Sequence, residues 1–222
     1  MINEFNENGY LILNNVFDQN TINSCKEEIL HYINNINNNN NKSCEGISIP
    51  DFINKKGFEN TINLKNNKKI HELLKIIFSG TDYRFCSHND IGVNRIVGWH
   101  KDKLNNQYSK YQTINIWNKY NQEKHEIVKV LIYLEDHSND NYGLKIIPKS
   151  HLNPNIKIEN TKQLKPKLGD VIIFDQRITH RGMEKNMDGT RILISFGFGK
   201  NNIFTDEFEK GTIQRQNDQN NL

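Results

Sequence analysis

The hydrophobic positions of this chain change their spacing about one third of the way along it. In the N-terminal part, Ile22, Cys25, Ile29 and Ile33 recur at helical spacing after Asp18, a residue type that commonly begins a helix. A second helix is predicted from about residue 69 to 78, with its apolar positions on one side. Before both, residues 9–13 form a short run of bulky β-forming side chains, which predicts a strand.

After Thr81 the pattern is that of short strands separated by turn residues. The predicted strands are Tyr83–Ser87, Val93–Trp99, Thr113–Trp117, Ile127–Leu134, Leu144–Ile147, Asp170–Phe174 and Arg191–Phe198. Seven short strands following N-terminal helices indicate a mainly β fold, a sandwich or barrel supported by helices. We find no internal repeat or linker, so residues 1–222 are expected to form a single domain. Residues 34–42 are predicted to be an Asn-rich surface loop, and residues from about 201 to 222 a C-terminal tail.

Composition excludes several classes of protein. No apolar run is long enough to span a bilayer, and the N-terminus lacks the basic and apolar regions of a signal peptide. Three widely separated Cys residues do not suggest a disulfide framework, so we expect a protein of the reducing cytoplasm. A net charge of +3 spread along the chain gives no indication of a nucleic-acid partner. The sequence does not indicate an oligomeric state.

Two of the eight His residues begin a His-x-Asp sequence, at His88 and at His100. Because about one His-x-Asp or His-x-Glu is expected by chance, the pattern alone is weak evidence. On a strand, however, residues i and i+2 point to the same face, so His100 and Asp102 can converge on one metal ion. His180 is the predicted third ligand, which would complete the two-His, one-carboxylate triad of non-haem Fe(II) oxygenases.

Arg191 is the candidate for binding 2-oxoglutarate, if that is the cosubstrate. The chain has 37 Asn, no Ala and only six Arg against 23 Lys, which suggests a biased coding sequence in which an Arg is informative. Arg191 follows His180 by eleven residues, and its planar guanidinium can bind a carboxylate through two hydrogen bonds. A salt-bridged strand residue is the alternative interpretation of Arg191.

Several motifs together resemble the phytanoyl-CoA dioxygenase family over about residues 5–200. They are Trp99-His100-Lys-Asp102, Gly143-Leu-Lys-Ile-Ile-Pro-Lys-Ser-His151, Gly169-Asp-Val-Ile-Ile-Phe174 and the pair His180 and Arg191. The resemblance implies a double-stranded β-helix (jelly-roll) fold that uses Fe(II) and 2-oxoglutarate. It implies that His100, Asp102 and His180 bind iron and that Arg191 binds 2-oxoglutarate.

The chain also departs from the family pattern. Lys149 stands where a Gly is common, and Gly182 stands where a small hydroxyl residue often assists cosubstrate binding. The strand at 127–134 lacks a Trp that is frequent there. Asp102 is present, whereas relatives that halogenate lack this carboxylate, so halogenation is disfavoured.

Other residues have less specific interpretations. His88, Trp117 and Arg181 are candidates for lining the substrate pocket, and residues 103–124 for a lid. His125 and His137 are expected to be exposed to solvent, and His151 to support a turn.

The function expected from these observations is hydroxylation of a small-molecule or lipid-like substrate with O2, releasing succinate and CO2. Two alternatives are a non-redox or non-enzymatic cupin-like metal-binding module and a nucleic-acid or protein oxygenase on the same barrel.

Overall fold

The computed structural model describes residues 1–40, 46–102, 125–155, 157–184 and 189–220. The predicted strand at 113–117 and the predicted lid at 103–124 lie outside these residues. Along the described part, the helices are α1 (Ile2–Asn8), α2 (Gln19–Asn40), α3 (Glu59–Asn63), α4 (Lys68–Ile77) and α6 (Ile203–Asn220), with short 3-10 turns at Phe52–Asn54, Leu64–Asn66 and Ser150–Leu152. The strands are β1 (Tyr10–Leu13), β2 (Ile47–Pro50), β3 (Tyr83–Val93), β4 (Ile127–Tyr133), β5 (Lys145–Ile147), β6 (Lys162–Gln163), β7 (Val171–Asp175), β8 (Thr179–Arg181) and β9 (Ile192–Lys200).

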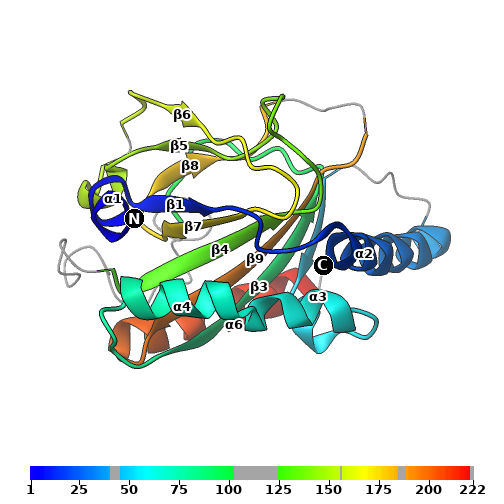
Figure 1. The fold of residues 1–222 in the computed structure, drawn as a ribbon. Helices are drawn as coiled ribbons and strands as arrows, with labels where there is room; N and C mark the ends of the chain where they lie inside the picture. The colour runs from blue at the N-terminus through cyan, green and yellow to red at the C-terminus, as the bar shows by residue number, and fades with distance from the viewer. Residues whose placement is uncertain (41–45, 103–124, 156, 185–188, 221–222) are drawn as a thin grey trace.

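These strands form two antiparallel sheets, which confirms the mainly β fold class. One sheet has six strands in the order β1-β7-β4-β9-β3-β2, and the other has three in the order β6-β5-β8. Figure 1 shows the smaller sheet above the larger one, with α3 and α4 below the larger sheet and α2 beside it at the right. Among the described residues, the two sheets do not close into a complete barrel.

The period-two alternation of each strand divides its side chains between two hydrophobic clusters. Along β4, Val128, Val130 and Ile132 belong to the cluster shared with α2 and α4. Leu131 and Tyr133 belong to the cluster between the two sheets. Lys129 lies between Val128 and Val130, so its side chain points to the same face of the sheet as those of Leu131 and Tyr133. The side chains of β4 that face inward therefore line the space between the sheets.

The N-terminal helices follow the predicted pattern closely. Asp18 accepts a hydrogen bond from the Thr21 backbone N–H at 2.7 Å and caps the first turn of α2. α4 coincides with the helix predicted from about residue 69 to 78. However, α2 continues to Asn40, so the prediction of a loop at 34–42 is wrong for residues 34–40. Asn costs only a fraction of a kcal/mol per residue in a helix, and an established helix extends at little cost.

The prediction of a tail at 201–222 is also wrong, because residues 203–220 form α6. This helix packs along β3, and its buried positions include Phe208, Thr212, Arg215 and Gln216. Since most of that buried stripe is polar, the hydrophobic pattern could not reveal it. Arg215 and Gln216 instead pair with polar groups of β3.

The strand predicted at 93–99 is wrong too, since β3 is one strand that ends at Val93. Its pairing with β9 shifts between Phe85 and Asn89, where Ser87 has a φ of 57°. Residues after Val93 leave the sheet and lead to His100. No helix in the described part of the chain is long and apolar enough to cross a membrane.

Candidate metal centre

Backbone pairing brings His100 and His180 together. The two residues form an antiparallel bridge, in which His100 N–H donates to the His180 carbonyl at 2.9 Å and His180 N–H donates to the His100 carbonyl at 3.0 Å. His180 lies in β8, on the smaller sheet, and His100 lies in the segment that follows β3. The pairing places two imidazoles with their ring centroids 4.3 Å apart.

The hydrogen bonds of the two rings determine which nitrogen is left for a metal. His100 Nδ1 lies 2.8 Å from the Gly98 carbonyl, and His180 Nδ1 lies 3.0 Å from the Ile178 carbonyl. A carbonyl can only accept, so each Nδ1 carries the proton and each Nε2 presents a lone pair. Both Nε2 atoms face Asp102, with Oδ1 at 3.6 Å from His100 and 4.0 Å from His180.

These three ligand atoms lie within 4.8 Å of one another. No second group of three or more His, Cys, Asp or Glu side chains with this geometry occurs in the described residues. The structure therefore brings together the three residues that the sequence suggested as metal ligands, although their binding of metal stays a prediction.

The electrostatic environment gives His180 and Asp102 the protonation states that a divalent metal requires. Burial lowers the pKa of His180 to about 3, and the neighbouring His100 acts in the same direction. Burial alone would raise the pKa of Asp102, but Lys129 and His180 hold it well below its usual value. A neutral imidazole with a free Nε2 and an ionised carboxylate are the forms that bind Fe(II), so these side chains fit the metal.

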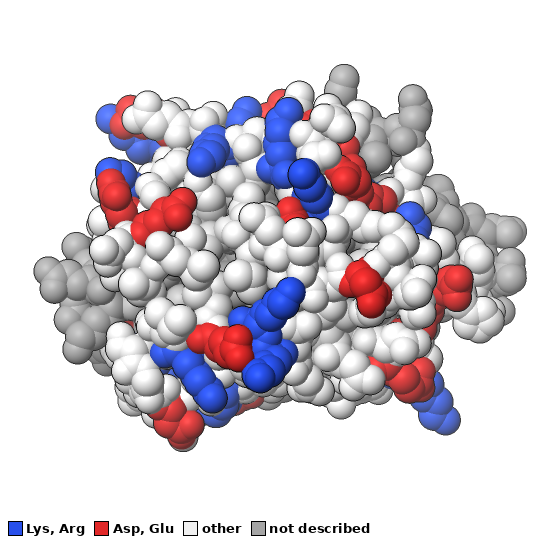
Figure 2. All heavy atoms as spheres, in the orientation of Figure 1, with Lys and Arg blue, Asp and Glu red and all other residues white. Residues whose placement is uncertain are grey.

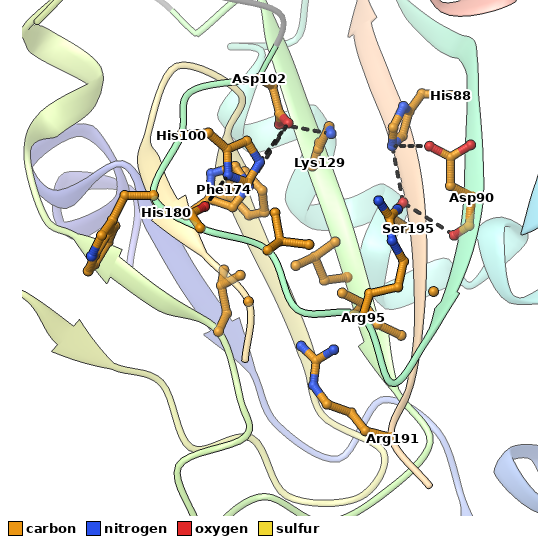
Figure 3. Close-up of a pocket in the computed structure, with 18 of the residues that line it drawn as sticks. His88, Asp90, Arg95, His100, Asp102, Lys129, Phe174, His180, Arg191 and Ser195 are labelled. Atoms are coloured by element: carbon orange, nitrogen blue, oxygen red, sulfur yellow. Dashed lines mark hydrogen bonds and ion pairs between the residues drawn. The ribbon is translucent and has the colours of Figure 1, made fainter. Parts of the chain in front are cut away.

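Lys129 holds the second oxygen of the carboxylate. Its Nζ lies 2.8 Å from Asp102 Oδ2, and the lysine is 8% exposed. The ion pair leaves Asp102 Oδ1 directed at the two His rings (Figure 3). Sequence reasoning did not single out Lys129, although a lysine within the apolar run of β4 was a signal.

Arg191 is a buried cation at another point of the same cavity. It is 2% exposed, its Nε donates to the Tyr142 carbonyl at 2.6 Å and its NH2 donates to the Tyr133 hydroxyl at 3.0 Å. No carboxylate among the described residues forms an ion pair with it. Because buried charges are normally paired, the remaining donors of Arg191 fit a carboxylate supplied by a ligand.

A cavity of about 560 Å³ connects the triad with Arg191. Its apolar wall is formed by Leu131, Leu144, Phe174 and Leu193, and its polar wall includes His88, Asp90 and Ser195. Figure 3 shows the His88 wall across from the triad, with Arg191 at the lower end. The volume lies within the range of small-molecule sites.

The other candidates from the sequence have different outcomes. His88 lines the cavity, with Nε2 at 3.1 Å from Ser195 Oγ. Arg181 does not line it, because its guanidinium lies over Trp99 and pairs with Glu184 at 3.0 Å. Trp117 lies outside the described residues.

The expectation that His125 and His137 are exposed is wrong. Both are buried, and each has Nδ1 within 2.9 Å of a carboxylate, Asp175 for His125 and Asp140 for His137. The contact between His125 and Asp175 could not be read from the sequence, since the two residues are distant along the chain.

The departures from the family pattern have local explanations. Lys149 adopts the left-handed conformation with a φ of 65°, so it keeps the turn that a Gly would make, and its Nζ pairs with Glu7 at 2.6 Å. Gly182 lines the cavity without a hydroxyl group. Leu131 and Tyr133 occupy inward positions of β4, where no Trp is present.

Comparisons with known proteins identify the family and the fold of this chain. The family model of phytanoyl-CoA dioxygenase (PhyH) matches residues 5–192, whereas no curated protein sequence matches the chain. Among solved structures, HygX from Streptomyces hygroscopicus, with nickel and 2-oxoglutarate bound, has a TM-score of 0.64 at 16% identity, covering 89% of this chain and 85% of HygX.

Two further structures are similar. AviO1 from Streptomyces viridochromogenes Tue57 has a TM-score of 0.67 at 16% identity, covering 90% of this chain and 93% of its own. SnoN, a non-haem α-ketoglutarate-dependent epimerase from nogalamycin biosynthesis, has a TM-score of 0.66 at 14% identity, covering 92% and 86%. These likenesses support the jelly-roll fold, and the family match covers most of the sequence. The chain therefore belongs to the phytanoyl-CoA dioxygenase family.

Proposed function

We propose that this protein is an Fe(II)- and 2-oxoglutarate-dependent oxygenase that hydroxylates a small molecule. The observation that carries the proposal is the joint presence, in one cavity, of a convergent His-Asp-His triad and of a buried arginine without a carboxylate partner among the described residues. A metal-binding module that does not use 2-oxoglutarate has no need of a buried arginine that is available to a ligand's carboxylate.

Each side chain has a definite task in this proposal. His100 and His180 bind Fe(II) through Nε2, because their Nδ1 atoms are occupied by the Gly98 and Ile178 carbonyls. Asp102 supplies Oδ1, and Lys129 restrains its rotation by holding Oδ2. Three protein ligands would leave coordination positions of the metal open for the cosubstrate and O2.

Arg191 orients the cosubstrate by binding its distal carboxylate. The guanidinium is fixed by the Tyr142 carbonyl and the Tyr133 hydroxyl, so little conformational freedom is lost on binding. With O2, Fe(II) and 2-oxoglutarate supply the oxidising power for hydroxylation, and the cosubstrate leaves as succinate and CO2. Leu131, Leu193 and Phe174 exclude water from the space beside the metal and present an apolar surface to the C–H bond.

The charge distribution supports a small molecule rather than a nucleic acid as the substrate. On the face drawn in Figure 2, basic and acidic side chains are interspersed. An oxygenase acting on nucleic acid would be expected to carry a continuous basic surface.

Anaerobic spectroscopy tests the proposal directly. Addition of Fe(II) and then 2-oxoglutarate should produce a metal-to-ligand charge-transfer band. Arg191→Met should weaken 2-oxoglutarate binding by about 100-fold, because a charged hydrogen-bonded contact of 1.5–3 kcal/mol or more is lost. Arg191→Lys should lose less. A folded wild-type protein without the band would contradict the proposal, and unchanged 2-oxoglutarate affinity in Arg191→Met would contradict the role of Arg191.

A further inference from the structure

We propose that the substrate is an organic anion whose charged end binds Arg95, with its apolar part lying against the metal. This inference rests on the proposed function for the identity of the reaction, but its binding component can be tested without it. It follows from the charges that line the cavity and from the position of one guanidinium among them.

The described residues that line the cavity carry more positive than negative charge. Among them are four Lys or Arg, Arg95, Lys129, Arg191 and Arg215, against the carboxylates of Asp90 and Asp102. Bound Fe(II) and the dianion of 2-oxoglutarate would cancel each other, so the loaded cavity would keep an excess of two positive charges with neutral His. A cavity of this sign favours an anionic ligand.

Three of these cations already have a partner or a task. Arg215 NH2 lies 2.6 Å from Asp90 Oδ2, and Lys129 Nζ lies 2.8 Å from Asp102 Oδ2. Burial alone would raise the pKa of Asp90, but Arg215 lowers it to about 2, so this pair remains ionised. Arg191 is the enclosed cation assigned above to 2-oxoglutarate.

Arg95 remains without a carboxylate among the described residues. The hydrogen bond recorded for its guanidinium runs from NH1 to Ser48 Oγ at 3.3 Å, which is long and involves a neutral acceptor. The residue is half-buried, so it is accessible to a ligand that enters from solvent, unlike Arg191.

Gly92 directs the Arg95 side chain along the cavity wall. A Cβ atom at Gly92 would lie 3.2 Å from Arg95 Cδ, closer than most such contacts, so the absence of a side chain there gives the arginine stem its room. Figure 3 shows Arg95 lying between Arg191 and the wall that carries His88 and Ser195. A ligand held there would extend past Leu193 and Leu131 toward the triad.

The substrate class is therefore an amphiphilic molecule with an apolar body and a terminal carboxylate or phosphate. The guanidinium fork binds either group through paired hydrogen bonds. The apolar wall beside the metal accommodates the saturated part of such a molecule.

The test compares three probes of equal chain length: octanoate, octyl phosphate and octan-1-ol. Each is titrated calorimetrically into metal-free protein, and into protein loaded anaerobically with Fe(II) and saturating 2-oxoglutarate. We expect at least one anionic probe to bind at least about tenfold more tightly than octan-1-ol. Which of the two anions binds more tightly distinguishes a carboxylate substrate from a phosphate substrate. In the loaded protein the probe should perturb the charge-transfer band without abolishing it.

Variants then locate the anion. Arg95→Met should remove the preference for the anion while 2-oxoglutarate affinity stays within about twofold of wild type, and Arg95→Lys should retain part of it. Arg84→Met is the matched control, because Arg84 lies outside the cavity and pairs with Asp206 and Glu209. It should keep the full preference.

Three results would overturn the inference. The first is that the three probes bind with equal affinity, or that neither anion shows saturable binding. The second is that the anion preference survives Arg95→Met but is lost in Arg191→Met. The third is that the anionic probes displace 2-oxoglutarate. Failure of the proposed function is a different result, a wild-type protein with no charge-transfer band. In that case the calorimetry on metal-free protein still decides whether Arg95 binds the anion.

Discussion

Among the clusters of His, Asp and a basic residue in the described part of the chain, the one around Asp175 and the one around Asp102 differ in what the lone pairs of their side chains face. In the first, Asp175 is fully buried and its two oxygens accept from the Arg177 backbone N–H, from Arg177 Nε and NH2, and from His125 Nδ1, all at 2.7–2.9 Å. In the second, Nε2 of His100 and Nε2 of His180 face Asp102 Oδ1 at 3.6 and 4.0 Å, beyond normal hydrogen-bond distance.

The difference separates a structural cluster from a binding site. In the Asp175 cluster every carboxylate lone pair is used inside the protein, so no ligand is needed to complete it. In the triad, backbone carbonyls hold the Nδ1 atoms and Lys129 holds one oxygen, which leaves three donor atoms directed at one point beside a cavity. Residue type alone would not distinguish the two clusters.

The largest effect is expected from breaking the Asp175 cluster. Asp175→Asn should lower the free energy of unfolding by about 3–5 kcal/mol, because it removes the buried carboxylate charge that pairs with the Arg177 guanidinium. Urea denaturation measures this loss. At urea concentrations too low to unfold it, the Asp175→Asn protein should still give the charge-transfer band with Fe(II) and 2-oxoglutarate. A loss below about 1 kcal/mol would mean that the cluster is not structural.

Matched histidine substitutions sharpen the comparison. His180→Ala should weaken Fe(II) binding by about 100-fold or more, because a metal ligand is lost, and should lower the free energy of unfolding by only about 1 kcal/mol through the lost hydrogen bond from Nδ1 to the Ile178 carbonyl. His125→Ala should do the reverse, costing about 1.5–3 kcal/mol of stability through its lost bond to Asp175 while leaving metal affinity unchanged. Metal titration and urea denaturation of both variants decide this. If both variants changed metal affinity and stability in the same way, the distinction between a structural cluster and a metal site would fail.

Acid should destabilise the protein through His151, a neighbour of the Asp175 cluster. Burial lowers the pKa of His151 to about 4, whereas an unfolded His has a pKa near 6.5. As the pH falls from 7 to 5, the unfolded chain takes up the proton first, so stability should fall by about 2 kcal/mol from this group. The slope of unfolding free energy against pH should be smaller in His151→Gln. Equal slopes in the two proteins would contradict this role of burial.

The smallest expected effect concerns Lys129, which supports the triad without binding the metal. Lys129→Met should weaken Fe(II) binding by about tenfold, because residues that orient a ligand typically contribute 10–100-fold to metal affinity. Lys129→Arg should restore part of the loss. The position of the charge-transfer band should shift in Lys129→Met, which a purely structural role would not produce. An unchanged band and affinity would show that Asp102 needs no such support.

The helices and strands that could be predicted from the sequence are those that depend on local patterns of residues. The start of α2 at Asp18, the extent of α4 and most strands follow from capping and periodicity, which act between residues close in sequence. The errors at residues 34–40 and 203–220 arose because helix formation there depends on the rest of the molecule, on the preceding helix in the first case and on contacts with β3 in the second. α6 in particular is stabilised by the polar contacts of Arg215 and Gln216 with β3.

Some residues of the candidate site could be identified from the sequence and others could not. The residues His100, Asp102, His180 and Arg191 were identifiable because their types and spacing match a known chemistry. Lys129 and Arg95 were not, since a charged residue on a predicted strand gives no sign of what it will face. His88 was identified as a pocket residue, but its contact with Ser195 was not predictable.

By itself, the sequence determined the alternation of apolar positions and hence which side chains of each strand face the space between the sheets. Only the tertiary structure decided that His100 pairs with His180, that Lys129 neutralises Asp102, and that Arg95 and Arg191 are left without a carboxylate among the described residues. The physical reason is that periodicity depends on neighbours along the chain, whereas the pairing of charges depends on which distant strands the packing of the whole core brings together.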